Sequence, residues 1–212
     1  MISETPLPAT PSATIASPNK IIENRFGFRK YQGDLLDGLA HGHGICECRD
    51  GGKYVGSFKK GQFDGYGTYT IGNEKEEGYF KHGLLNGRGT IKYSNGDVYE
   101  GDFRDGRKFG HGTLKFSNGD VYEGDFKFGA IEGRGTVKYS NGTVYKGEFR
   151  KGKKWGKGTN FYTSGVRYKG NFTKDRKDGE GIKITEDGSR FKMVYKDGKK
   201  ISSTPMPRSR AP

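Results

Sequence analysis

Residues 99–121 read YEGDFRDGRKFGHGTLKFSNGDV, and residues 122–144 read YEGDFKFGAIEGRGTVKYSNGTV. Both stretches follow the pattern Y-x-G-x-F-x-x-G-x-x-x-G-x-G-T. A third copy begins at Tyr145 with YKGEFRKGKKWGKGTNFYTSGVR. Self-similarity at a fixed period identifies a repeat architecture. The chain is therefore a tandem repeat, and its unit decides the fold.

The repeat can be followed along the chain by its first residue. Repeats begin at Tyr31, Tyr54, Glu76, Tyr99, Tyr122, Tyr145, Tyr168 and Phe191, and they are 23 residues apart except for one interval of 22. The sequence thus contains seven full repeats and an eighth that ends after Gly198. Because the turn at residues 71–75 is one residue short and Glu76 replaces an aromatic residue, we expect a local irregularity there.

Each repeat predicts two short antiparallel strands. Tyr99, Gly101 and Phe103 are spaced by two, so in a strand their side chains lie on one face, and the charged residues between them lie on the other. The second strand alternates in the same way, with Gly112 and Leu114 on the first face. We call the side of the sheet that carries the rings and glycines the aromatic face, and the opposite side the reverse face.

The turn between repeats has to preserve this alternation. A two-residue loop at Asn118-Gly119 would turn one strand over, because a shift of one residue exchanges the faces. A three-residue loop, residues 117–119, pairs Phe116 with Asp120 and Leu114 with Tyr122. It requires Gly119 in the left-handed conformation.

Glycine usually weakens a strand, yet here it recurs on the face that carries the large rings. We interpret this as rings lying over neighbouring glycines, where no Cβ obstructs them. The predicted fold is all-β: an elongated, single-layer, twisted antiparallel sheet of tandem β-hairpins. Most of its rings would form the core, and some would stay partly open along an aromatic groove.

The domain boundaries follow the period. Residues 1–20 are rich in Pro, Ser and Thr and are predicted to be a disordered tail. Residues 21–30 are predicted to be an irregular lead-in that caps the first edge, and residues 31–201 the repeat array. Residues 202–212 are predicted to be a disordered basic tail.

Composition and charge restrict the class of protein. The mean hydropathy is −0.90 and the net charge is +13, of which residues 146–212 carry +12. No apolar run approaches the roughly 20 residues of a membrane span, and the first residues lack a secretory signal pattern. Two cysteines are too few for a disulfide framework. We therefore expect a soluble, cytoplasmic protein.

These residues resemble the MORN-repeat proteins (membrane occupation and recognition nexus), whose hallmark is Y-x-G-x-F/W-x-x-G-x-x-x-G-x-G. The match covers about residues 31–200, with departures at Leu35, Glu76 and Asp175. The resemblance implies an elongated β-hairpin array. Similar proteins include radial spoke head proteins of cilia, junctophilins at membrane contacts, cytoskeletal scaffolds of protists and regulatory segments of lipid kinases.

Motifs for catalysis or metal binding are weak. The stretch HGHGICEC suggests a zinc site, but Cys46 and Cys48 fall on the aromatic face while His41 and His43 have the opposite parity, so the four cannot converge on one ion. The glycine pairs lie within strands and do not open a helix, as a phosphate loop requires. Acidic pairs such as Glu100 and Asp102 lie on an open charged face without a pocket, and we expect them to be solvated or to pair with lysine across strands. We predict no catalytic residue, no metal and no cofactor.

Three hypotheses for function follow. The first is a non-enzymatic scaffold that binds an extended segment or helix of a partner protein in a cytoskeletal or ciliary (axonemal) assembly. Its contacts would line the aromatic groove: Tyr99, Phe103, Tyr122, Phe126, Tyr145, Phe149 and Trp155.

The second hypothesis is a peripheral membrane tether that binds anionic phospholipids through the basic last third, where successive loops would stack into a ridge. Its residues would be Arg150, Lys151, Lys153, Lys154, Lys157, Lys174, Arg176 and Lys177. The positive charge alone is weak evidence for nucleic-acid binding, because the sequence contains no nucleic-acid recognition element beside it. The third hypothesis is a regulatory subunit of a separate enzyme, which the resemblance to lipid-kinase segments allows. The sequence does not determine the oligomeric state.

Overall fold

The computed structural model describes residues 15–23 and 28–207, with the backbone alone for 15–23. These residues form one antiparallel sheet of seventeen strands, in which each strand is hydrogen-bonded to the strands before and after it in the chain. The described residues contain no helix. The predicted all-β, single-layer array of hairpins is confirmed.

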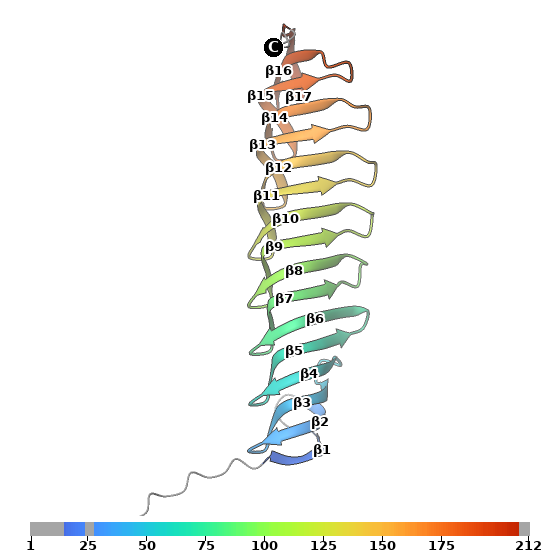
Figure 1. Ribbon diagram of the computed structural model, residues 1–212, viewed down its shortest axis with the longest axis vertical. Coiled ribbons are helices and arrows are strands. Elements are labelled where there is room, and N and C mark those ends of the chain that lie inside the picture. Colours follow the sequence, from blue (N-terminus) through green and yellow to red (C-terminus); the bar gives the residue numbers. More distant parts are fainter. Residues whose placement is uncertain (1–14, 24–27, 208–212) are drawn as a thin grey trace, which may run out of the picture.

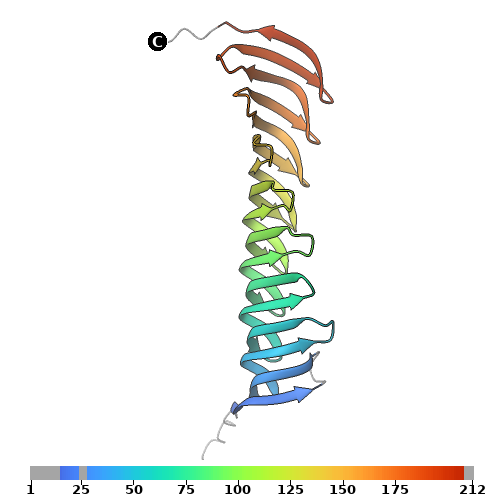
Figure 2. The same ribbon diagram turned by 90° about the vertical axis from the view of Figure 1, so that its right-hand side faces the viewer.

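The strands are β1 (Ile15–Glu23), β2 (Phe28–Leu36), β3 (Leu39–Cys48), β4 (Lys53–Lys59), β5 (Gln62–Ile71), β6 (Glu74–Lys81), β7 (Leu84–Lys92), β8 (Val98–Arg104), β9 (Arg107–Lys115), β10 (Val121–Lys127), β11 (Ala130–Lys138), β12 (Val144–Arg150), β13 (Lys153–Phe161), β14 (Arg167–Thr173), β15 (Arg176–Ile184), β16 (Arg190–Lys196) and β17 (Lys199–Pro205). They stack like rungs along one long axis (Figure 1). Figure 2 shows the sheet from the side, with its strands curved and the stack turning gradually toward the C-terminus.

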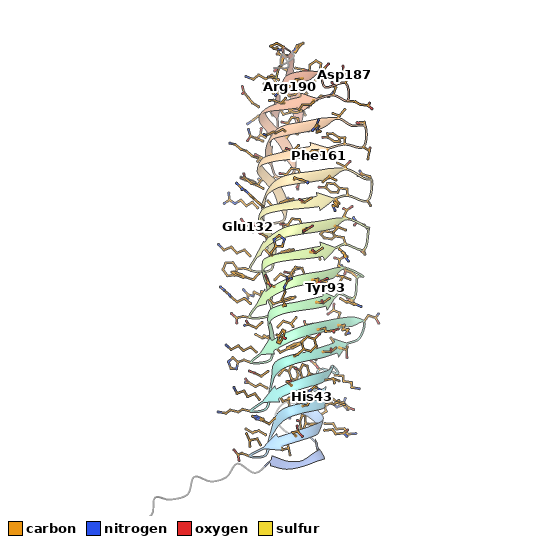
Figure 3. The ribbon with its side chains drawn as sticks, in the orientation of Figure 1. His43, Tyr93, Glu132, Phe161, Asp187 and Arg190 are labelled. Atoms are coloured by element: carbon orange, nitrogen blue, oxygen red, sulfur yellow. The ribbon has the colours of Figure 1, made fainter. Side chains whose placement is uncertain are left out.

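Two kinds of turn alternate on the two sides of the ladder. Tight turns join the strands within a repeat, and longer turns join one repeat to the next (Figure 1). In Figure 3, Glu132 lies beside the tight turns and Tyr93 beside the longer ones. Each side of the molecule is therefore a column of equivalent turns.

The longer turns confirm the predicted register. Leu114 pairs with Tyr122 and Gly112 pairs with Gly124 across β9 and β10. Phe116 N donates to Asp120 O at 2.9 Å, and Gly119 has a φ of 89°. The loop is therefore residues 117–119, with its glycine in the left-handed region that favours a residue without Cβ.

The tight turns have two residues, both with positive φ, such as Asp105 at 49° and Gly106 at 72°. This is the type I′ turn, whose twist matches that of the flanking strands. From the second repeat onward the tight turns also bond to the repeat before them; Gly106 N, for example, donates to Leu85 O at 2.9 Å. The equivalent bond recurs from Gly129 to Lys108 and from Gly152 to Ile131, so the turns are stacked by backbone bonds as well as by the strands.

The core is a column of rings on the aromatic face. Tyr99 contacts Phe103 and Phe126 edge to face at centroid distances of 5.0 and 4.9 Å. Tyr122 then contacts Phe126 and Phe149 in the same way, both at 5.2 Å. Such pairs stabilise beyond their buried area. The column joins each repeat to the next without needing a globular core.

The glycines make room for this column. A Cβ built on Gly112 would lie 2.6 Å from Tyr99 Cε2, and one on Gly135 would lie 2.5 Å from Tyr122 Cε2. No real Cβ tolerates such contacts. The prediction that a ring lies over a glycine of the neighbouring strand is confirmed, and the ring also lies over a glycine of its own strand, since a Cβ on Gly101 would lie 2.5 Å from Tyr99 Oη.

The third repeat is irregular, as predicted. Ile71 pairs directly with Glu74, so the turn is the two residues Gly72-Asn73, with Gly72 at a φ of 55°. Glu76 stands where other repeats have tyrosine, and Leu85 is buried near the vacated space, opposite Phe80. The ring column is therefore interrupted once.

The ends of the array differ from the predicted tails. Residues 15–20 belong to β1, which pairs with β2, so the expected disorder does not extend to them. Residues 202–205 belong to β17, which pairs with β16. In both places backbone pairing with an open sheet edge forms a strand without the repeat motif. The remainder of the predicted tails, 1–14 and 208–212, lies outside the described residues.

Candidate binding surfaces

The aromatic face is more closed than its predicted groove. Tyr99, Tyr122 and Tyr145 are 0% exposed, and Phe103, Phe126 and Phe149 are 3–6% exposed. The prediction that these six rings contact a partner needs correction, because each ring is covered by the repeats on either side of it. They act as core.

Lysine side chains complete the cover. Lys108 Nζ lies 5.5 Å from the ring centroid of Tyr99, and Lys154 Nζ lies 4.8 Å from those of Tyr139 and Tyr145. Lys177 Nζ lies 4.4 Å from the Tyr168 ring. Burial lowers the pKa of Lys154, which is what desolvation of an ammonium group does. Lys154 and Lys177, predicted to stand on the basic ridge, instead lie over the rings, where cation–π attraction holds them.

Trp155 lies on the other side of the sheet. Phe149 pairs with Lys154 across β12 and β13, so Lys154 shares the aromatic face and the next residue, Trp155, points to the reverse face. There the guanidinium of Arg150 lies 5.2 Å from its ring centroid. Arg104 and Phe109 form the same pair two repeats earlier, at 4.1 Å. Trp155 is therefore not part of the ring column.

The remaining basic residues of the predicted ridge are exposed at the tight turns. Arg150, Lys151 and Lys153 surround the β12–β13 turn, and Lys174 and Arg176 surround the β14–β15 turn. Their turns stack through the Asp175 N to Lys154 O bond of 3.1 Å. We call these five residues the basic turn band. Lys157 is not among them, because it lies on the reverse face further along β13.

A long hollow lies on the reverse face. It is a groove of about 1200 Å³ lined by β9 to β16 and Met206. Charged residues line it throughout, including Lys146, Lys157 and Lys169, with Glu123 toward one end and Glu180 toward the other. We call it the reverse-face groove. The period-two alternation of the sequence places these charged residues on one face, so it could have predicted the lining of the groove. It could not have predicted the curvature of the sheet, which forms the hollow.

Among the residues that the structure describes, ion pairs on the reverse face are few and exposed. Arg88 Nε lies 3.6 Å from Asp102 Oδ1, and His111 Nδ1 lies 3.5 Å from Asp125 Oδ1. Both pairs join cross-strand neighbours, but the partners of the aspartates are an arginine and a histidine where the sequence predicted lysine. Exposed pairs of this kind contribute little to stability, so most of this charge remains free to meet a ligand.

The described part of the chain contains no cluster of three or more side chains suited to a metal ion. Cys46 and Cys48 are buried on the aromatic face with their sulfur atoms 3.4 Å apart, whereas His43 is exposed on the opposite face. This is the separation of cysteine and histidine that the register predicted. Within the described ranges, no helix is long and apolar enough to cross a membrane.

Comparison with known proteins gives three kinds of similarity: to sequence relatives, to solved structures and to a family model. Alsin from Homo sapiens and from Rattus norvegicus is 41% identical over 76 residues, which is 33% of this chain but only 5% of the length of alsin. Among solved structures, the TCP domain of SAS-4 (dCPAP) of Drosophila melanogaster, in complex with a proline-rich motif of Ana2, matches with a TM-score of 0.49 and 12% identity. That match covers 92% of this chain and 99% of the domain.

The TCP10 domain of Danio rerio CPAP, in complex with a peptide of STIL, matches with a TM-score of 0.47 and 16% identity, over 91% of this chain and 99% of the domain. The family model named MORN repeat matches residues 31–53, 54–74, 77–98, 99–121, 122–144, 145–167 and 168–190. These matches coincide with the seven repeats that the ring column and the paired turns define. The chain belongs to the MORN repeat family.

Proposed function

We propose that this chain is a non-enzymatic scaffold that binds an extended segment of a partner protein along the reverse-face groove. The observation that carries the proposal is the groove itself, which runs over eight consecutive strands. At about 4.8 Å per strand it is roughly 34 Å long. A trough of that length suits a polymer better than a small molecule, whose sites enclose most of the ligand.

The architecture supports a scaffold role. Each repeat contacts only its neighbours, and solenoids of this kind present long surfaces for binding. The rings and the backbone hydrogen bonds hold the repeats together. The side chains of the reverse face are not needed for this contact, so their charges can differ from repeat to repeat. A cytoskeletal or ciliary assembly is the cellular setting we propose, because elongated binding surfaces suit filament-associated complexes.

A photo-crosslinking experiment tests this function. A benzoylphenylalanine residue placed at Lys157, which is exposed and lines the groove, should crosslink a native partner in cells. The same residue at Asn141, exposed in a longer turn outside the groove, is the matched control. Crosslinks to one protein from position 157 and not from 141 support the proposal. Equal crosslinking at both positions, or none at position 157, contradicts it.

A second candidate is binding to an anionic membrane surface, which the basic turn band favours. Its five exposed cations stand on stacked turns along one side of the sheet, and each basic residue near an anionic membrane contributes about 1 kcal/mol. Vesicle flotation with phosphatidylserine tests it. Binding at low salt that is lost in K151Q/K153Q/K174Q/R176Q supports it, and binding that survives these changes rejects it.

A further inference from the structure

One row of side chains follows the reverse face along the length of the sheet. Successive strands from β6 to β16 place one residue each in register at its centre. We call this the central row: Glu77, Thr90, Glu100, Thr113, Glu123, Thr136, Lys146, Thr159, Lys169, Ile182 and Lys192.

The central row reverses its charge at its midpoint. Glu77, Glu100 and Glu123 occupy every second strand up to β10, and Lys146, Lys169 and Lys192 occupy every second strand from β12. Thr136, on β11, lies at the centre. The 23-residue repeat supplies the same structural position each time, so the change from acid to base is a change of side chain alone.

Most of these charges are available. Glu100, Glu123, Lys146 and Lys169 are exposed, and none of the ion pairs found in the described part of the chain includes them. Only the two ends of the row are paired, Glu77 with Lys75 at 2.6 Å and Lys192 with Glu180 at 2.8 Å. The reverse-face groove contains the row from Glu123 to Lys192.

The spacing of the charges selects the shape of a ligand. Residues two strands apart are separated by about 9.6 Å. A polyproline II segment rises about 3.1 Å per residue with three residues per turn, so every third side chain falls on one side at intervals of about 9.3 Å. Six charges on the row therefore correspond to about 16 residues of such a segment.

Resting on the proposed scaffold function, we propose that the partner segment is a polyproline II stretch of two oppositely charged halves. One half carries an acidic side chain at every third residue and faces Lys146, Lys169 and Lys192. The other half carries a basic side chain at every third residue and faces Glu77, Glu100 and Glu123. The reversal of charge near Thr136 fixes where along the sheet the segment lies.

The reversal also argues against a uniformly charged polymer. A nucleic acid or an all-acidic segment would meet lysines over half of the row and glutamates over the other half. Like charges brought together in this way oppose binding and exclude wrong partners. A segment with one acidic and one basic half makes favourable charge contacts along the whole row. This complementarity distinguishes it from uniformly charged partners.

Fluorescence anisotropy with synthetic probes tests the proposal on the full chain. The first probe is a labelled proline-rich peptide of about 18 residues with Glu at every third position of one half and Lys at every third position of the other. The second has the same composition with its charges clustered. The third carries Glu in both halves, and a single-stranded RNA of equal length is the fourth. The first should bind at least about tenfold more tightly than the others.

Charge reversal then locates the site. K146E/K169E/K192E makes the row acidic throughout, so it should weaken the first probe by about tenfold or more and favour a probe with Lys in both halves. The matched control, K81E/K127E/K196E, makes the same change of net charge at exposed positions outside the groove and outside the basic turn band. It should leave the order of the probes unchanged. Circular dichroism checks that both variants keep their strands.

Three outcomes overturn the inference: equal binding of the periodic and clustered peptides, equal binding of RNA or the all-acidic peptide, or equal loss in the two triple variants. A native partner that crosslinks at position 157 while the periodic probe shows no preference would leave the scaffold function standing and remove this inference alone. Loss of that crosslink as well would remove both.

Discussion

The hydroxyl of Tyr122 donates a hydrogen bond to the backbone carbonyl of Asp125, 3.0 Å away. Tyr99 and Tyr145 make the same bond to the residue three positions ahead, at 3.0 and 3.1 Å. The repeat tyrosine thus anchors its own strand while its ring covers the glycines. Tyr168 is the exception, because its hydroxyl is buried without a hydrogen-bond partner.

This difference predicts unequal effects of removing the hydroxyl. Tyr122→Phe loses a hydrogen bond and leaves the Asp125 carbonyl without that donor, so it should destabilise by about 1 kcal/mol. Tyr168→Phe removes an unpartnered hydroxyl and should be neutral or stabilising. Urea unfolding of the two variants measures the comparison. Equal losses would show that the bond to Asp125 contributes nothing.

The fit of ring over glycine predicts a second contrast. Gly135→Ala places a Cβ against the Tyr122 ring and should destabilise by about 1–3 kcal/mol, because a packed core resists added volume. Gly89→Ala is the matched control: it occupies the same position in the third repeat, where Glu76 replaces the tyrosine and the nearest ring atom to an added Cβ, Phe103 Cε2, is 3.3 Å away. Its nearest neighbours are 3.0 Å away or more. Thermal unfolding should show a larger loss for Gly135→Ala, and the reverse order would contradict the packing described.

One tight turn carries a poorly suited residue. Phe128 has a φ of 51° and is 69% exposed, so a bulky side chain occupies the left-handed region with little burial in return. Asn tolerates that conformation and would form the Asn-Gly sequence typical of type I′ turns. Phe128→Asn should stabilise by about 1 kcal/mol in thermal unfolding. Lys127→Asn, at the adjacent exposed strand position, should not stabilise.

Glu76 predicts a dependence of stability on pH. Burial, with a contribution from the Glu74 carboxylate, raises the pKa of Glu76 above its ordinary value. The folded state therefore holds the proton more tightly than the unfolded state, and this contribution to stability is lost as pH rises through the folded pKa. Glu76→Gln removes the buried charge.

The Gln variant should consequently melt at a higher temperature than the original chain at about pH 7, and the difference should shrink toward about pH 4, where the carboxyl is protonated. Melting curves across this range measure it. A Glu76→Gln advantage that stays constant with pH would rule out the buried carboxylate as its cause.

The fold was predictable because period-two alternation and a 23-residue repeat leave little choice of register. Pairing Leu114 with Tyr122 is the arrangement that keeps Tyr99, Gly101 and Phe103 on one face, and the structure has it. The irregularity at Glu76 was equally visible, since a missing residue in a turn has to change that turn.

The binding surface was less predictable, for physical reasons. Whether Tyr122 is exposed depends on how closely Phe126 and Phe149 approach it from both sides, and no single repeat contains that information. Lys154 and Trp155 are adjacent in sequence but lie on opposite faces of the sheet. The prediction that both belong to one basic loop therefore combined residues from two different surfaces. The curvature that hollows the reverse face arises from many strands together. Residues 15–20 and 202–205 form strands because a sheet edge offers pairing to any extended backbone.

Every strand from β2 to β16 finds its hydrogen-bond partners in the strands immediately before and after it. Nothing in such an arrangement fixes how many repeats there are, so duplicating or deleting a 23-residue unit changes the reach of the molecule by about 9.6 Å and disturbs only the junction. The length of the molecule can therefore be changed one repeat at a time, by evolution or by design. The protein can act as a spacer of defined length as well as a binding scaffold.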